Sequence, residues 1–297
     1  MKYVITGASG NTGKIIAKNL LQAGKQVIAV SRNESKIQDL LELGATVAIG
    51  DLEDTDFLTN TLAGVDAVYA LNPPKFDLQE DWRVYQDRIT DSFIEAIRKS
   101  KIENVVLLSS AGSHLPSGTG PVAGLYYFEE LLKKVDGLNV FALRPGFFIQ
   151  NLYAQIPLIK QAGIVGYSLK PDVEIPFTHT NDIAEAATEK LLNLNFIGFE
   201  KGFVSGAKDY TMPEVAAILG NAIGKPDLSY VSFSNDDAKA GMVQSGLPET
   251  VAAGYVELFD ALNQGTYLND YTRTPENTTK TTLEDFAPEF AVAYRNN

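Results

Sequence analysis

The chain has 297 residues, a net charge of −12, 21% charged residues and no cysteine. An acidic chain of this kind is a poor partner for nucleic acid or an anionic membrane, because both attract basic surfaces. The absence of cysteine excludes disulfides, thiolate catalysis and cysteine-ligated metals, and the two histidines, His114 and His179, lie far apart, so we expect no metal.

A glycine-rich turn follows the first predicted strand. Apolar residues 3–5 lead into the sequence TGASGNTG at 6–13, and a helix is expected directly after it. Gly7 permits the tight turn, Gly10 lets a pyrophosphate approach the backbone, and Gly13 lets the helix pack closely on the strand. This arrangement is typical of dinucleotide sites, where N–H groups at a helix start bind phosphates. The residues of this loop expected to bind the cofactor are Gly7, Ser9, Gly10, Asn11, Thr12 and Gly13.

Five further apolar runs recur along the chain, with helical patterns between them. They cover residues 27–30, 47–49, 67–71, 105–108 and 140–143. Continuous apolarity, rich in valine and isoleucine, indicates strands buried on both faces of a parallel sheet. The helical pattern is clear within 81–99, where an apolar stripe recurs at helical spacing. The sequence therefore predicts an α/β protein with a Rossmann-type, doubly wound parallel sheet.

The pattern changes after about residue 150. Prolines and glycines become frequent, and we expect a strand at 202–205 and a helix over 213–223. We interpret residues 1–150, with returning elements near 178–206, as an NAD(P)-binding domain. The rest, residues 151–177 and 207–297, is expected to form a smaller lobe on the substrate side, over the carboxyl edge of the sheet.

Polar residues follow successive strands, where sites in doubly wound sheets lie. Arg32 follows the second strand, nineteen residues after Gly13, at the place where sites that prefer NAD have a carboxylate. A guanidinium matches a ribose 2′-phosphate, so Arg32, supported by Lys36, predicts a preference for NADP(H) over NAD(H). The alternative is a solvated arginine at a strand end. The other cofactor-binding candidates at strand ends are Asp51, Leu52, Leu71, Asn72, Pro73, Ser109 and Ser110.

These motifs together resemble the NmrA-like family, in the atypical branch of the short-chain dehydrogenase/reductases, and especially its flavin-free NAD(P)H:quinone oxidoreductases. The matching stretches are residues 6–13, 31–33, 50–52, 143–148 with Asn151, 181–186, 245–249 and 281–286. The resemblance implies hydride transfer from NADP(H), without flavin or metal, to a small planar acceptor such as a quinone. A second reading stays open, because the family includes regulators: a non-catalytic, NADP-binding redox sensor that signals to a protein partner.

Catalytic members of the wider superfamily use a Tyr-x-x-x-Lys pair, and a glutamate with two apolar residues commonly follows four residues after the lysine. Glu130 with the two leucines after it fits that ending, which puts Tyr126 at the lysine position and Val122 at the tyrosine position. Both catalytic residues are therefore missing, and oxidation of an alcohol by the usual route is not expected. NmrA-like proteins share this loss.

Three residues remain as candidates for catalysis by proton transfer: His114, Tyr126 and Tyr127. Each has a plainer alternative. Paired tyrosines at a helix start commonly pack in or beside a core, and His114 lies on a polar loop where it is equally a solvated residue. Water is a further proton source, because a reduced quinone is a stabilised oxyanion.

Aromatic residues follow the sixth strand and are expected to wall the acceptor pocket. These are Phe147, Phe148 and Tyr153, and such a lining suits a planar, weakly polar molecule. Farther along, His179 is expected to pack at the junction with the smaller lobe. Asp182 is expected to cap the helix that follows it.

No signal-peptide pattern and no apolar stretch of about 18 residues occurs in the sequence. We therefore expect a cytoplasmic protein whose partner is a small-molecule acceptor, with no nucleic acid and no membrane. A homo-oligomer is compatible with the sequence.

Overall fold

A seven-stranded parallel sheet forms the centre of the structure, a computed structural model that describes residues 1–78 and 80–297. The strand order is β10-β6-β5-β4-β1-β2-β3. The strands are β1 (Lys2–Ile5), β2 (Gln26–Ser31), β3 (Thr46–Ile49), β4 (Ala67–Leu71), β5 (Asn104–Leu108), β6 (Asn139–Pro145) and β10 (Phe199–Val204). All six predicted apolar runs are strands of this sheet, so the predicted α/β, doubly wound fold is confirmed.

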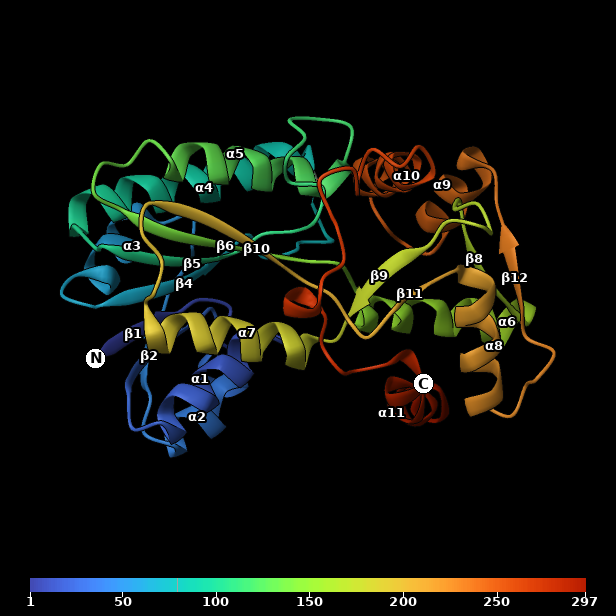
Figure 1. Ribbon diagram of the computed structural model, residues 1–297, viewed down its shortest axis with the longest axis horizontal. Coiled ribbons are helices and arrows are strands. Elements are labelled where there is room, and N and C mark those ends of the chain that lie inside the picture. Colours follow the sequence, from blue (N-terminus) through green and yellow to red (C-terminus); the bar gives the residue numbers. More distant parts are fainter. Residues whose placement is uncertain (79) are drawn as a thin grey trace.

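Helices cover both faces of the sheet, with α4 and α5 on one face and α1 and α7 on the other (Figure 1). The helices of this part are α1 (Gly13–Gln22), α2 (Gln38–Glu42), α3 (Thr55–Leu62), α4 (Trp82–Ser100), α5 (Ala123–Leu132) and α7 (Thr180–Asn193), with 3₁₀ turns η1 (Glu34–Ile37) and η2 (Gly120–Val122). The apolar stripe predicted within 81–99 forms the buried side of α4.

Successive residues of each central strand contribute to two separate cores. Val4 packs in the core under α4 and α5, whereas Tyr3 and Ile5 pack in the core under α1 and α7, and all three are fully buried. A strand points alternate side chains to opposite faces, so burial on both faces requires every position to be apolar. This is the physical reason for the continuous apolar runs.

The chain after β6 builds two small sheets and a third core, on the right in Figure 1. The sheets have the strand orders β11-β9-β7 and β12-β8. Their elements are β7 (Phe147–Phe148), η3 (Ile149–Gln155), α6 (Ile156–Ala162), β8 (Ile164–Tyr167), β9 (Ile175–Thr178), β11 (Asp209–Tyr210), α8 (Met212–Ala222), β12 (Ser229–Ser232), α9 (Asn235–Gln244), α10 (Glu249–Asn263), η4 (Pro275–Asn277) and α11 (Leu283–Asn296). We call these elements the C-terminal part. The division into domains at residue 150 stays a prediction.

Residues 264–282, here called the strap, link α10 to α11 and run past the end of the sheet (Figure 1). The prediction that Asp182 caps the following helix is wrong. Asp182 does not cap α7: His179 is the N-cap, and its Nδ1 accepts the N–H of Asn181 at 3.0 Å. Asp182 lies inside the first turn of α7, and its carboxylate accepts hydrogen bonds from the hydroxyls of Thr279 and Thr281 at 2.5 and 2.7 Å. A capping side chain must precede the helix, where the backbone is extended, and Asp182 comes too late in the chain for that.

His179 lies at the junction, as predicted. Its ring and that of Phe286 on α11 pack edge to face with their centres 6.1 Å apart, and its Nε2 lies 3.4 Å from a carboxylate oxygen of Glu289.

Among the residues that the structure describes, no helix combines the length and apolarity needed to cross a bilayer.

Candidate functional site

Two glycines hold the first loop tightly against the sheet. Gly7 has φ +62°, and a Cβ added there would lie 2.7 Å from a methyl carbon of Leu71 at the end of β4. A Cβ added at Gly13 would lie 2.4 Å from the carbonyl oxygen of Gly7. Both positions therefore exclude any side chain, and α1 starts as close to β1 as the backbone allows.

The first turn of α1 keeps its N–H groups without a capping side chain. Thr12 is the N-cap, but its hydroxyl accepts a hydrogen bond from the phenol of Tyr69 at 3.1 Å and none from an N–H of the helix. The turn also contains no acidic residue. Of the N–H groups of this turn, that of Lys14 donates to the Gly10 carbonyl at 3.2 Å. The remaining N–H groups and the positive end of the helix dipole attract an anion, so the loop fits the pyrophosphate of a dinucleotide.

Arg32, directly after β2, and Lys36, in η1, are exposed, and the charges of Arg32 and Asp51 both act on Tyr85 of α4. Burial raises the pKa of Tyr85 to about 12, and the positive charge of Arg32 acts in the opposite direction. The sequence interpretation missed Lys75, whose ammonium lies 5.2 Å from the centre of the Tyr85 ring. The one sign of this role in the sequence is the position of Lys75, directly after the two prolines that follow β4.

The candidates at the ends of β4 and β5 differ in their surroundings. The amide nitrogen of Asn72 lies 3.4 Å from the Thr90 hydroxyl, and its buried Oδ1 has no hydrogen-bond partner among the described residues. The hydroxyl of Ser110 lies 2.9 Å from that of Tyr267, which comes from the strap. Ser109 instead points inward and donates to the carboxylate of Glu129 at 2.5 Å.

Glu129 is the centre of a buried polar network that the sequence interpretation missed. It lies on the inner side of α5, is 1% exposed, and accepts two hydrogen bonds from Arg144, at 3.0 and 2.5 Å. Arg144 donates in addition to Asp270 of the strap at 2.7 Å, and Asp270 also accepts from Lys201 of β10 at 2.9 Å. The neighbouring Glu130 faces outward instead.

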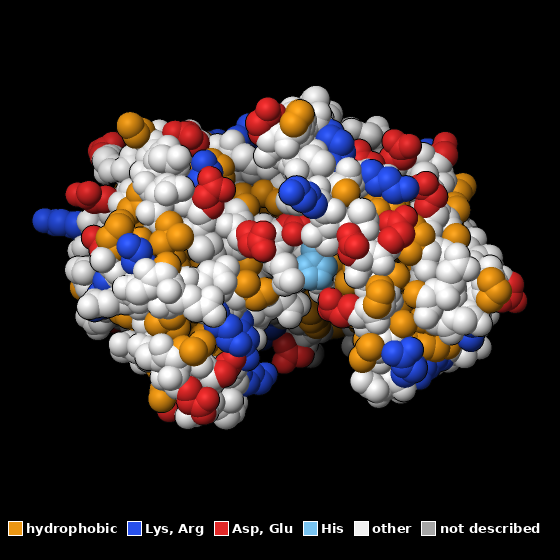
Figure 2. All heavy atoms as spheres, turned by 60° about the horizontal axis from the view of Figure 1, so that its bottom comes forward, with side chains coloured by type: hydrophobic (Ala, Val, Ile, Leu, Met, Phe, Trp, Pro, Cys, Tyr) orange, Lys and Arg blue, Asp and Glu red, His pale blue; other side chains and the backbone are white. Residues whose placement is uncertain are grey.

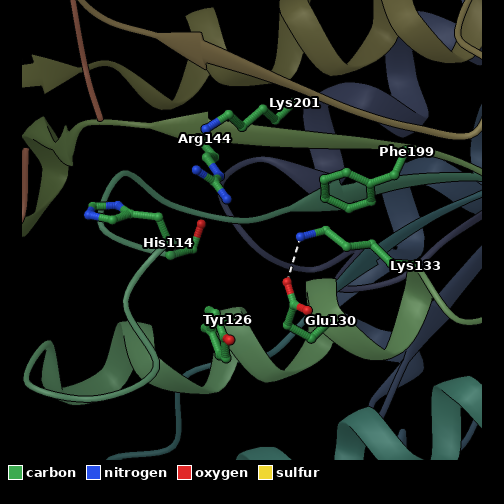
Figure 3. A pocket seen from close by; sticks show the side chains of 8 residues that line it. His114, Tyr126, Glu130, Lys133, Arg144, Phe199 and Lys201 are labelled. Atoms are coloured by element: carbon green, nitrogen blue, oxygen red, sulfur yellow. Dashed lines mark hydrogen bonds and ion pairs between the residues drawn. The ribbon is translucent and has the colours of Figure 1, made fainter. Parts of the chain in front are cut away.

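A cavity of about 390 Å³ lies between α5 and β10 (Figure 3). We call it the edge cavity; its lining residues are Ser113, His114, Tyr126, Glu130, Lys133, Arg144, Phe199 and Lys201. The structure thus brings His114 and Tyr126 to one cavity. Tyr127 lies apart from them, because its hydroxyl donates to Asp91 on α4 at 3.0 Å.

His114 lies beside the strap with both ring nitrogens unsatisfied. Its Nδ1 is 2.9 Å from a carboxylate oxygen of Asp270, close enough for an ion pair. The contact is not aligned for a hydrogen bond, however, and neither nitrogen has such a partner among the described residues.

The three predicted wall residues do not face the same core. Phe147 meets the edge of Phe177 at 5.4 Å, and Tyr153 packs on Phe286 at 5.3 Å and stacks on Phe290 at 6.0 Å. We call these five residues, Phe147, Tyr153, Phe177, Phe286 and Phe290, the aromatic cluster. Phe148 packs against the other core, under α1 and α7, because adjacent residues of β7 point in opposite directions. Burial and the hydrogen bond to Glu289 raise the pKa of Tyr153.

The surface is hollowed between the sheet part, at α1 and α2, and the C-terminal part, at α8 and α11 (Figure 2). The glycine loop comes from one side of this division, and α11, which carries Phe286 of the aromatic cluster, from the other.

Comparisons with known proteins agree with this geometry. The profile of the NAD(P)H-binding family matches residues 7–161. An NAD(P)H azoreductase of Xenophilus azovorans is 28% identical over 295 residues, covering 98% of this chain and 97% of its own length. Quinone oxidoreductase 2 of Escherichia coli is 26% identical over 254 residues, with 84% and 83% covered. The crystal structure of an NADPH-dependent quinone oxidoreductase from Escherichia coli with NADPH has the same fold, with a TM-score of 0.83, 22% identity, and 97% and 99% covered.

Proposed function

The chain belongs to the family of NAD(P)H-binding proteins, and from this membership we propose that it is an NAD(P)H-dependent oxidoreductase that reduces a small planar acceptor such as a quinone. The observation that carries the proposal is the first loop, where Gly7 and Gly13 press α1 onto β1 and the helix start stays uncapped. Relatives that match most of the chain are named for azo and quinone reduction, which supports a planar acceptor.

The chain's own residues suit the parts of the dinucleotide in order along the sheet edge. The amides of residues 11–13 hold the pyrophosphate, whereas the Gly10 amide already donates to the Gly7 carbonyl at 2.8 Å. Arg32 and Lys36 hold a 2′-phosphate, which gives a preference for NADP(H). Lys75 adds a third positive charge nearby. When bound, the cofactor supplies a hydride from its nicotinamide ring. The remaining proposed contacts are Asp51, Leu52, Leu71, Asn72, Pro73 and Ser110. Ser109 is left out, because its hydroxyl points inward and donates to Glu129.

The acceptor lies against Phe147 and Tyr153 of the aromatic cluster in this proposal. Aromatic rings bury a flat molecule and hold its plane, and catalysis then depends on keeping acceptor and hydride donor about 3–3.5 Å apart. Phe148 is left out of this wall, because it points to the other face of β7 and packs against the core under α1 and α7.

The reaction proceeds without a Tyr-x-x-x-Lys pair in this proposal. Counted back from Glu130, the two positions are Tyr126 and Val122; counted back from the buried Glu129, they are Leu125 and Pro121. With either glutamate, the lysine position does not hold a lysine and the tyrosine position does not hold a tyrosine. A reduced quinone is a stabilised oxyanion, so water suffices as the proton source. His114 and Tyr126, on the edge cavity, are the side chains to test against it.

The decisive experiment follows NADPH absorbance with a panel of quinones and azo compounds. We expect turnover above background with at least one planar acceptor, and faster turnover with NADPH than with NADH. His114→Ala and Tyr126→Phe should each retain turnover within about twofold, because neither is required as an acid. A loss above about tenfold in one of them would assign the proton to that side chain.

The redox-sensor alternative makes the opposite prediction. It requires cofactor binding without turnover across the whole panel, and capture of a protein from lysate that depends on the oxidation state of the added cofactor. Turnover together with cofactor-independent capture excludes it.

A further inference from the structure

The edge cavity lies at the opposite end of the sheet from the proposed 2′-phosphate site. Its strand residues come from β6 and β10, whereas Arg32 follows β2, and four strands separate β10 from β2 when the strands between them are counted in order. The side chains proposed to hold the acceptor, Phe147 and Tyr153, do not line the cavity. His114 and Tyr126 do line it, but the proposed reaction requires neither of them as an acid.

Three cationic side chains line this cavity in a protein whose net charge is −12. Lys133, the residue directly after α5, and Arg144 of β6 extend toward the middle of the cavity, with Lys201 of β10 beside Arg144 (Figure 3). Arg144 is neutralised by the buried Glu129 and by Asp270. Each lysine has one acidic partner: Glu130 for Lys133, at 2.5 Å, and Asp270 for Lys201, at 2.9 Å.

The cations have hydrogen-bond donors to spare. An ammonium has three N–H donors, so one bond to a carboxylate leaves two on each lysine. Arg144 uses three of its five donors. A carboxylate has two oxygens that together accept about four hydrogen bonds, so one bound carboxylate matches the four spare donors of the two lysines.

The remaining walls are aromatic. Tyr126 of α5 and Phe199 of β10 line the cavity, and the Lys133 ammonium lies 4.5 Å from the centre of the Phe199 ring. A ligand here therefore meets flat apolar surface next to positive charge. At about 390 Å³ the space is near the lower limit of the roughly 300–1,000 Å³ typical of ligand pockets, so it suits one or two rings and not a nucleotide.

We propose that the edge cavity is a second binding site, for a small aromatic carboxylate. The carboxylate binds Lys133 and Lys201, and the ring packs on Tyr126 and Phe199. Glu130 is the competitor, because its carboxylate holds Lys133 in the free protein and must give way. Both members of that pair are about a third exposed, at 38% and 34%, so the exchange costs little.

The test is calorimetric titration of the full chain with sodium 2-naphthoate and with the uncharged 2-naphthamide, at low ionic strength. We expect the carboxylate to bind at least about tenfold more tightly than the amide. Lys133→Ala and Lys201→Ala should each weaken naphthoate about three- to tenfold, the range of a partly exposed to a well-placed charged contact. Glu130→Gln should tighten it about two- to fivefold, a change that a merely structural role would not produce.

Lys134→Ala is the matched control, since Lys134 is exposed, follows Lys133 directly and does not line the cavity. It should leave affinity within about twofold. The titration needs no turnover, and repeating it with saturating NADPH separates the two sites: binding should persist unchanged. Absence of binding at 10 mM, equal binding of the amide, equal loss in Lys134→Ala, weaker binding in Glu130→Gln, or competition with NADPH would each overturn the proposal.

Discussion

At the residue scale, we expect one side chain, Arg32, to set the preference for NADP(H) over NAD(H). Arg32→Ala removes the proposed fork on the 2′-phosphate, a charge-assisted contact worth about 1.5–3 kcal/mol. The dissociation constant for NADPH should therefore rise about 10- to 100-fold, while that for NADH stays within about twofold. Titration of both cofactors checks this, with Arg98→Ala as a control, because Arg98 is exposed near the far end of α4. Equal losses for NADPH and NADH would contradict the assignment.

Two adjacent glutamates should respond very differently to the same substitution. Glu129→Gln leaves the guanidinium of Arg144, 3% exposed, with Asp270 as its one remaining anion. Breaking a buried pair from one side costs about 3–5 kcal/mol, and the surviving partner favours the lower end of that range. Glu130→Gln breaks a partly exposed pair and should cost less than about 1 kcal/mol. Urea unfolding of both variants measures the difference, and equal free energies of unfolding would remove Glu129 from the centre of the network.

Among the elements, the contact between β1 and α1 tolerates the least change. Gly13→Ala adds a carbon 2.4 Å from the Gly7 carbonyl, so the helix must move from the strand, at a cost of about 1–3 kcal/mol. The same shift disturbs the amides proposed for the pyrophosphate, so cofactor affinity should fall as well.

Gly241→Ala is the matched control for Gly13→Ala. Gly241 lies within α9 and has no atom within 4 Å of an added Cβ, so alanine there should stabilise the protein by about 0.5–1 kcal/mol. Thermal unfolding of both variants is the measurement. A Gly13→Ala protein as stable as the parent would mean that the loop is not closed in this way.

The elements also explain how far sequence reasoning reached. Strand position followed from local apolarity, because burial on both faces leaves no choice of residue, and all six runs were right. The role of Asp182 could not be predicted, since its partners, Thr279 and Thr281, lie almost a hundred residues later. Glu129 and Glu130 are adjacent and chemically identical, so the sequence does not tell which is buried. The rotation of α5 about its axis turns Glu129 inward. The binding and catalytic roles at the sheet edge stay predictions.

At the scale of the whole molecule, residues 1–150 are not expected to fold alone. The core under α1 relies on α7, whose Ile183, Ala187 and Leu191 are fully buried against it. Strand β10 forms one edge of the sheet, beside β6. A fragment of residues 1–150 should therefore show no cooperative unfolding by far-UV circular dichroism. A fragment that unfolds with the stability of the full chain would show that the returning elements are dispensable.

The bond between Arg144 and Asp270 joins positions 126 residues apart. During synthesis β6 leaves the ribosome long before the strap does. Until then Arg144 has only one of its two acidic partners, Glu129, because Asp270 has not yet been synthesised. Contacts of such long sequence separation form late and slow the folding of a domain. The strap is thus the last segment to reach this edge of the sheet, and Arg144 gains its full set of ion pairs only after the strap has left the ribosome.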